Sequence, residues 1–201
     1  MTKTSLEARV VRLARKQGVL RSRDFEAEGV NRMALRRLVE AGVLERVGRG
    51  LYSLPRGKVT EHHSLVEATL RVPKGVVCLL SALQFHNLST QSPHEVWLAV
   101  SNLAWKPKTD WPPLRVVRFS GTALTHGVER HRLEGVDVAV TTAAKTVADC
   151  FKYRNKIGLD VALEALTEYR RKRGSVDALM KAAAVDRVAR VLRPYLEAMS
   201  S

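Results

Sequence analysis

Residues 29–55 read GVNRMALRRLVEAGVLERVGRGLYSLP, and this stretch decides the fold expected for the N-terminal quarter of the chain. Asn31 can cap a helix that runs to Ala41, and Gly42 closes it. The inner stripe of this helix is apolar at helical spacing and consists of Leu35, Leu38 and Val39. On a helical wheel, the arginines of this helix lie outside this stripe and point outward.

After Gly42 the hydrophobic period changes from 3.6 residues to 2. Val43–Val47 and Leu51–Leu54 are short β-prone runs. The segment Gly48-Arg49-Gly50 between them is typical of a hairpin turn. We therefore predict a two-stranded ribbon with an arginine at its tip.

Two helices are predicted before this stretch. The first spans Lys3–Gln17 and stops at Gly18; the second starts at Ser22, whose hydroxyl can cap it, and ends by Gly29. Three helices followed by a ribbon is the order of a winged helix-turn-helix, whose third helix lies in the DNA major groove. We expect such a domain over residues 1–58.

The side chains of this predicted domain suit a nucleic acid. Arginine can fork onto guanine edges or phosphates, and the amides of a helix start suit phosphate. The alternative is that the helix arginines form the solvated face of a core helix. The residues predicted to bind DNA are Asn31, Arg32, Met33, Arg36, Arg37, Arg46 and Arg49.

The charge of the chain is strongly positive and uneven. Thirty-four Lys and Arg residues against twenty Asp and Glu residues give a net charge of +14, which favours a polyanionic partner. Residues 1–59 hold 14 basic and 6 acidic residues, residues 60–140 hold 8 and 7, and residues 141–201 hold 12 and 7. General solubility is the alternative explanation of this excess.

The rest of the chain predicts a second domain over residues 60–201, after a linker at Pro55–Thr60. Strands are followed by helices, which indicates an α+β class with a small antiparallel sheet at about 95–140 and a C-terminal helical bundle at about 143–199. The expected helices and strands are Glu61–Arg71, Ser81–Leu88, Glu95–Ser101, Leu114–Phe119, Val128–Leu133, Val136–Val140, Ala143–Lys152, Leu159–Arg173, Ser175–Ala184 and Asp186–Met199. Pro194 is expected to kink or restart the last helix.

Basic residues of the second domain form a candidate surface for a partner or for DNA. Lys145, Asp149 and Lys152 have the i, i+3 and i, i+4 spacings of a salt-bridged, solvated helix face. A helix end, where cations are favoured, explains the basic block at 170–173 almost as well. The candidate residues are Lys145, Lys152, Arg154, Lys156, Arg170, Arg171, Lys172 and Arg173.

Catalytic motifs are missing from the sequence. It has no tight acidic pair followed by lysine for a nuclease, no HExxH, no G-x-S-x-G and no glycine-rich phosphate loop. Cys78 and Cys150 cannot form a disulfide framework. We expect no enzyme, no metal and no cofactor. The longest apolar run, Val76–Leu80, is too short to span a membrane, and the N-terminus lacks a signal-peptide core, so a cytoplasmic location is expected.

The chain also resembles a known family, the AbiE (abortive infection) antitoxins of type IV toxin–antitoxin systems. Residues 29–55 look like their winged-helix domain, and residues 141–166, TTAAKTVADCFKYRNKIGLDVALEAL, resemble their second-domain signature. Residues 114–120, LRVVRFS, and 193–196, RPYL, are similar to further blocks. The resemblance implies phage defence, repression of the chain's own promoter at inverted repeats, and antagonism of a co-transcribed nucleotidyltransferase-like toxin.

Two readings of the second domain stay open. It opposes the toxin, either by direct binding or by reversing the toxin's chemistry, or it senses a ligand or dimerises within a stand-alone transcriptional regulator. The residues fix neither the operator sequence nor the choice between monomer and dimer.

Overall fold

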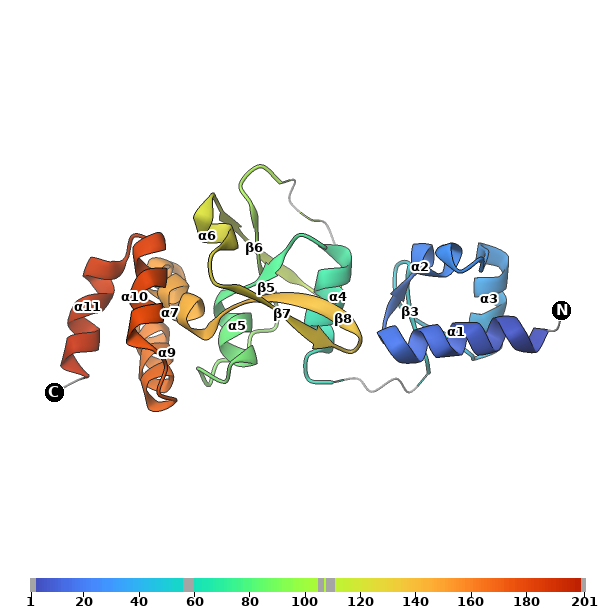
Figure 1. The fold of residues 1–201 in the computed structure, drawn as a ribbon, viewed down its shortest axis with the longest axis horizontal. Coiled ribbons are helices and arrows are strands. Elements are labelled where there is room, and N and C mark those ends of the chain that lie inside the picture. Colours follow the sequence, from blue (N-terminus) through green and yellow to red (C-terminus); the bar gives the residue numbers. More distant parts are fainter. Residues whose placement is uncertain (1–2, 56–59, 105–106, 108–110, 200–201) are drawn as a thin grey trace.

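The computed structural model describes residues 3–55, 60–104, 107 and 111–199, with side chains from residue 6 onward. The linker predicted at Pro55–Thr60 lies largely outside this range. The described chain is elongated, with the N-terminal helices at one end, a five-stranded sheet in the middle and a group of helices at the other end (Figure 1).

The N-terminal domain has three helices and a three-stranded antiparallel sheet of order β1-β3-β2. Its core is a single apolar cluster around Phe25, which is fully buried. Tyr52 packs edge-on against Phe25 with ring centroids 5.9 Å apart. The elements are α1 (Lys3–Gln17), β1 (Leu20–Arg21), α2 (Ser22–Ala27), α3 (Arg32–Glu40), β2 (Glu45–Gly48) and β3 (Leu51–Ser53).

Local signals explain the bounds of these elements, with one correction. Asn31 caps α3, since its side-chain oxygen accepts the backbone N–H of Ala34 at 2.8 Å. The sequence predicts that Ser22 caps α2, but in the structure it does not. Arg21 is the N-cap residue, and the Asp24 carboxylate accepts its backbone N–H at 2.7 Å. An acidic residue in the first turn therefore replaces the expected hydroxyl.

The middle of the chain builds a five-stranded sheet of order β6-β5-β4-β8-β7. This sheet is mixed: β4 pairs parallel with β8 and β5 pairs parallel with β6, while the other two pairs are antiparallel. The expected all-antiparallel sheet is therefore wrong for this domain. The elements are α4 (His63–Arg71), β4 (Val76–Val77), α5 (Leu79–Phe85), β5 (Val96–Ser101), β6 (Leu114–Phe119), α6 (Thr122–Thr125), β7 (Val128–Leu133) and β8 (Val136–Thr141).

Two strands explain this topology. The strand β4 has only two residues, too few for an alternating pattern, yet it sits at the centre of the sheet. The strand β5 is buried on both faces, because Leu98 packs in the apolar cluster that contains Leu65 of α4 and Trp97 packs in the cluster that contains Leu83 of α5. Burial on both faces is typical of parallel pairing, which helices cover from both sides.

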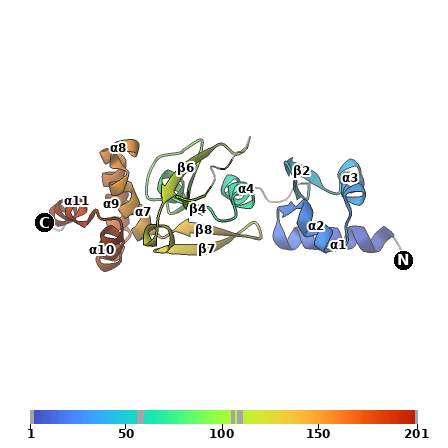
Figure 2. The same cartoon turned by 90° about the horizontal axis from the view of Figure 1, so that it is seen from above.

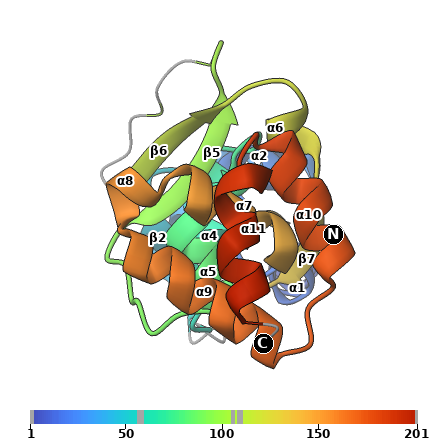
Figure 3. The ribbon, with the colours of Figure 1, turned by 90° about the vertical axis from the view of Figure 1, so that its left-hand side faces the viewer.

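The C-terminal helices gather around α7, which contacts α5, α9 and α10 (Figure 3). Asp186 is the C-cap of α10, so the predicted helix from Asp186 starts three residues later, and Pro194 lies inside it. Ser81, the first residue of the predicted helix Ser81–Leu88, instead lies buried inside α5, and its hydroxyl oxygen accepts the N–H of Trp97 at 2.9 Å. The helices are α7 (Ala143–Lys152), α8 (Arg154–Ile157), α9 (Leu159–Arg171), α10 (Val176–Val185) and α11 (Ala189–Ala198).

Candidate nucleic-acid interface

Helix α3 is anchored by its apolar stripe and leaves its arginines outside. Leu35 and Leu38 are buried against the N-terminal core, so the opposite side of the helix faces solvent. All seven residues that the sequence predicts as DNA-binding are exposed. They are Asn31, Arg32, Met33, Arg36, Arg37, Arg46 and Arg49.

The arginines of α3 differ in their partners. Nε of Arg36 donates to Oε1 of Glu40 at 2.8 Å, and Nε of Arg32 lies 3.4 Å from Glu26. Both pairs are solvent-exposed and therefore contribute about 0.2–1 kcal/mol each. Arg37 has no ion pair among the described residues. A polyanion could thus recruit all three guanidinium groups at small cost.

Asn31 and Met33 complete the exposed start of α3. The cap uses the side-chain oxygen of Asn31, so its NH₂ group is the part left for an external acceptor. Met33 is 63% exposed, which is unusual for a large apolar residue and places a flexible thioether beside the arginines.

The hairpin places a second cationic element on the same side of the domain. Figure 2 shows β2 and α3 on one side of the N-terminal domain and α1 and α2 on the other. Arg49 is exposed at the turn, and Gly50 has a φ of +72°, a value that favours glycine. Nε of Arg46 donates to the Gly48 carbonyl at 3.2 Å and so points along the ribbon toward the turn.

The N-terminal domain also packs against the second domain. Val19 and Leu51 belong to the apolar cluster around α4, and the guanidinium of Arg21 donates to the carbonyl of Leu70 at the end of that helix. No sequence signal singles out Arg21. Among the described residues, the contacts between the domains do not involve the α3 arginines, so domain packing leaves that surface accessible.

A buried carboxylate fixes the second-domain side of this contact. Oε1 of Glu134 accepts both the N–H and the hydroxyl of Thr60, at 2.9 and 2.8 Å, and Oε2 lies 2.8 Å from Nδ1 of His63. Burial alone would raise the pKa of Glu134, but these hydrogen bonds outweigh it and lower the pKa. A Cβ on neighbouring Gly135 would lie 2.3 Å from the backbone of Gln17, so only glycine lets α1 come this close.

The prediction that Lys145 lies on a solvated surface of the second domain is wrong. Its side chain is fully buried, and its Nζ contacts the carboxylates of Asp149 and, at 3.0 Å, Asp186. The i, i+4 pairing with Asp149 is as expected, but surrounding helices cover the face that carries it. Burial raises the pKa of Asp149 well above its ordinary value, and its Oδ2 has no hydrogen-bond partner among the described residues.

The other predicted cations do not form one patch. Lys156 is exposed on α8 before the start of α9, whereas the basic block lies at the opposite end of α9, about 20 Å away at 1.5 Å per residue. Nζ of Lys172 donates to the carbonyls of His86 and Asn87, at 2.9 and 2.8 Å. The exposed members are Lys152, Lys156, Arg171, Lys172 and Arg173, and the half-buried ones are Arg154 and Arg170.

Two features are absent from the described residues. No group of three or more His, Cys, Asp or Glu residues within residues 3–55, 60–104, 107 and 111–199 is arranged to hold a metal ion. Within the same ranges, no helix combines the length and the apolar character that crossing a membrane requires.

Comparison with known proteins gives one family match. Residues 8–55 match the family model described as "Transcriptional regulator, AbiEi antitoxin". The match runs from within α1 to just past the end of β3 and contains all seven predicted DNA-binding residues. It confirms the resemblance over this segment; the similar blocks at 114–120, 141–166 and 193–196 lie outside it. No curated protein matches the chain.

Proposed function

We propose that this chain, whose residues 8–55 match the AbiEi antitoxin family of transcriptional regulators, is a DNA-binding antitoxin that represses its own promoter. The observation that carries the proposal is the exposed row of Arg32, Arg36 and Arg37 on a helix whose other side is buried. Guanidinium groups on one helix face suit guanine edges and phosphates in a major groove.

The order of elements supports a winged helix-turn-helix reading of this domain. Helices α2 and α3 are joined by four residues, and the β2–β3 hairpin follows directly. In such domains the second helix of the pair enters the major groove, and the hairpin contacts the adjoining backbone or minor groove. We assign these roles to α3 and to the hairpin turn that carries Arg49. Two copies on inverted repeats would then read an operator in double-stranded DNA.

We further propose that residues 60–201 counteract a nucleotidyltransferase-like toxin encoded beside this chain. The family description supports an antitoxin role. Direct capture of the toxin and reversal of its chemistry are the two routes for this antagonism. The role in abortive infection and phage defence, in the cytoplasm, is part of the same proposal.

Two assays test the proposal separately. Fluorescence anisotropy with a labelled duplex from upstream of the chain's own reading frame should show saturable binding that exceeds binding to a scrambled duplex. Co-expression with the adjacent nucleotidyltransferase-like gene should restore growth. Operator binding without growth rescue would leave a stand-alone regulator, whereas rescue without operator binding would remove the autorepressor role.

A further inference from the structure

The strand β6 has an open outer edge. It is the last strand of its sheet and pairs with β5 alone among the described strands. The carbonyls of Pro113 and Phe119 accept N–H groups of the β5 side, at 2.8 and 3.1 Å. Because backbone groups alternate in direction along a strand, those of Val116 and Arg118 point to the open side. The Tyr153 hydroxyl, which donates to the Arg118 carbonyl at 3.3 Å, marks that side.

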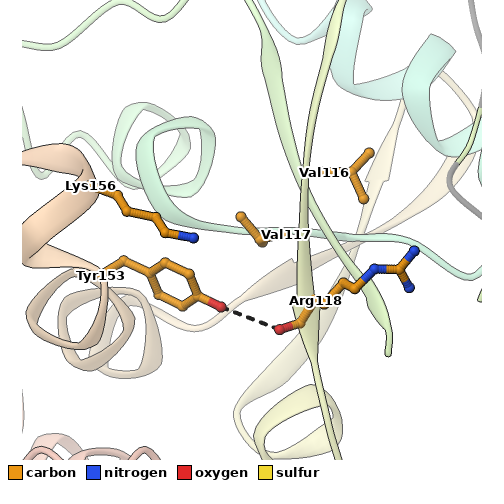
Figure 4. Close-up of a pocket in the computed structure, with 5 residues that line it drawn as sticks. All are labelled: Val116, Val117, Arg118, Tyr153 and Lys156. Carbon is orange, nitrogen blue, oxygen red and sulfur yellow. Dashed lines mark hydrogen bonds between the residues drawn. The ribbon is translucent and has the colours of Figure 1, made fainter. Parts of the chain in front are cut away.

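A pocket of about 370 Å³ lies along this edge. Figure 4 shows β6 on one side of it and Tyr153 and Lys156 of the α8 region on the other, with the Lys156 ammonium directed toward the strand. This ammonium lies 5.5 Å from the Tyr153 ring centroid, a cation–π distance that holds it over the pocket. Burial raises the pKa of Tyr153 to about 12, so its hydroxyl stays a donor at neutral pH.

Each wall of the pocket carries one basic residue. The strand β6 contributes Arg118 and α8 contributes Lys156, whereas Arg115 and Arg154 of the same elements do not line the pocket. Neither element contains an acidic residue. Arg115 is paired with Glu95 at 3.0 Å, and the Arg118 guanidinium is used by backbone carbonyls of the β5–β6 turn. Lys156 has no acidic partner among the described residues. Its positive charge is therefore available to an acidic group of a partner.

The opposite edge of the sheet carries more charged side chains than β6 does. The outer strand β7 carries Glu129, Arg130, His131 and Arg132 in succession, and charged side chains on an edge strand discourage pairing with another chain. The pocket side of β6 instead combines valines with free backbone groups. A sheet edge of this kind is a template for an added strand.

We propose that the β6 edge binds an extended segment of an acidic partner protein, which adds a strand at Val116 and places a carboxylate against Lys156. The backbone groups supply affinity, and Lys156 selects for negative charge. The surface lies in the second domain, away from α3, so the proposal stands independently of DNA binding.

The test uses the full chain and two soluble, β-prone peptides, TETETET and TKTKTKT. The acidic peptide should shift the backbone amide signals of Val116 and Arg118 in a saturable NMR titration, and the basic peptide should not. Val116→Pro, which removes one outward N–H, should abolish the shift of the Arg118 amide signal, whereas Arg130→Pro on the β7 edge should not. Lys156→Glu should weaken the acidic peptide about three- to tenfold, and Lys181→Glu, on the exposed side of α10, should leave it unchanged.

Circular dichroism establishes whether each variant is folded. If the Val116→Pro variant does not fold, the Lys156→Glu variant alone tests the proposal. Three outcomes would overturn the proposal. The first is binding of the acidic peptide that Lys156→Glu leaves unchanged. The second is a dimer in sedimentation that Val116→Pro dissociates, because a second copy would then occupy the edge. The third is a single-stranded oligonucleotide that shifts the same amides more strongly than the peptide.

Discussion

Nζ of Lys145 lies 3.0 Å from Oδ2 of Asp186, 41 positions along the chain, and both side chains are fully buried. The same ammonium contacts Asp149, one turn along α7. Lys152, which is partly exposed, reaches Asp186 at 3.7 Å. This charged cluster ties α7 to the end of α10 in the C-terminal half of the chain.

Replacing Lys145 tests the energetic weight of the cluster. Lys145→Met should lower the free energy of unfolding by about 3–5 kcal/mol, because the buried carboxyl groups of Asp149 and Asp186 lose the ammonium that contacts them. Urea denaturation followed by circular dichroism measures the change. Lys181→Met, which breaks the exposed Lys181–Asp177 pair, is the control and should stay within about 0.5 kcal/mol of the unsubstituted chain. Equal effects would show that burial of the Lys145 charge is unimportant.

The raised pKa of Asp149 predicts a pH dependence. The unfolded chain loses this proton near the ordinary aspartate pKa of about 3.9, whereas the folded chain holds it to higher pH. Stability from this group is therefore complete below the ordinary pKa and declines as the pH rises toward the folded value. Asp149→Asn should flatten this decline in urea midpoints measured from pH 4 upward. A slope that is the same in both proteins would contradict the assignment.

The hydrogen bonds of Glu134 to Thr60 and His63 give a pH dependence of stability with the opposite sign. Its pKa is lowered, so its contribution is present above the ordinary glutamate pKa and is lost as the pH falls through the folded value. At neutral pH, Glu134→Gln should cost about 1–3 kcal/mol, because the bonds to Thr60 and His63 weaken. Thermal unfolding measures it, with exposed Glu61→Gln as the control. An unchanged thermal unfolding midpoint would mean that the hydrogen bonds of Glu134 do not stabilise the fold.

The α3 arginines give the DNA-binding prediction. Arg36→Ala and Arg37→Ala should each weaken operator binding by about 1–3 kcal/mol, measured by anisotropy. Arg171→Ala, on exposed α9, is the matched control. Wild-type affinity in the Arg36→Ala/Arg37→Ala double variant would show that another element reads the DNA.

The hairpin arginine should behave differently from those of α3. Arg49→Ala should weaken binding to the operator and to a scrambled duplex alike, and should reduce the slope of log affinity against log salt by about one, because a phosphate contact is lost. Titrations at three salt concentrations measure this. Loss of affinity for the operator alone would make Arg49 a base-reading residue instead.

The two proposed roles should separate in one variant. The Arg36→Ala/Arg37→Ala chain should lose operator binding and keep growth rescue against the toxin, since neither arginine is buried. This change is preferable to removing the N-terminal domain, because Val19 and Leu51 pack in the same cluster as α4. Loss of both activities in the folded variant would mean that the domains do not divide the work.

Local sequence patterns were enough to predict an element wherever that element carries its own signal. The sequence prediction matches the bounds of β6 and α7, the Asn31 cap and the order of α3 and the hairpin, because caps, glycines and hydrophobic periods act within a few residues. Two-residue strands such as β4 carry no such signal, and their partners are distant in the chain. The mixed sheet therefore could not be predicted from its strands one at a time.

By itself, the sequence determined which residues of α3 face outward, because one apolar stripe leaves the rest of a helix surface to solvent. The tertiary structure alone decided the fate of Lys145 and the role of Arg21. A lysine four residues before an aspartate predicts the same pair on a wet or a dry helix face. Which of these it becomes depends on whether distant segments, such as the one that carries Asp186, fold over it and exclude water.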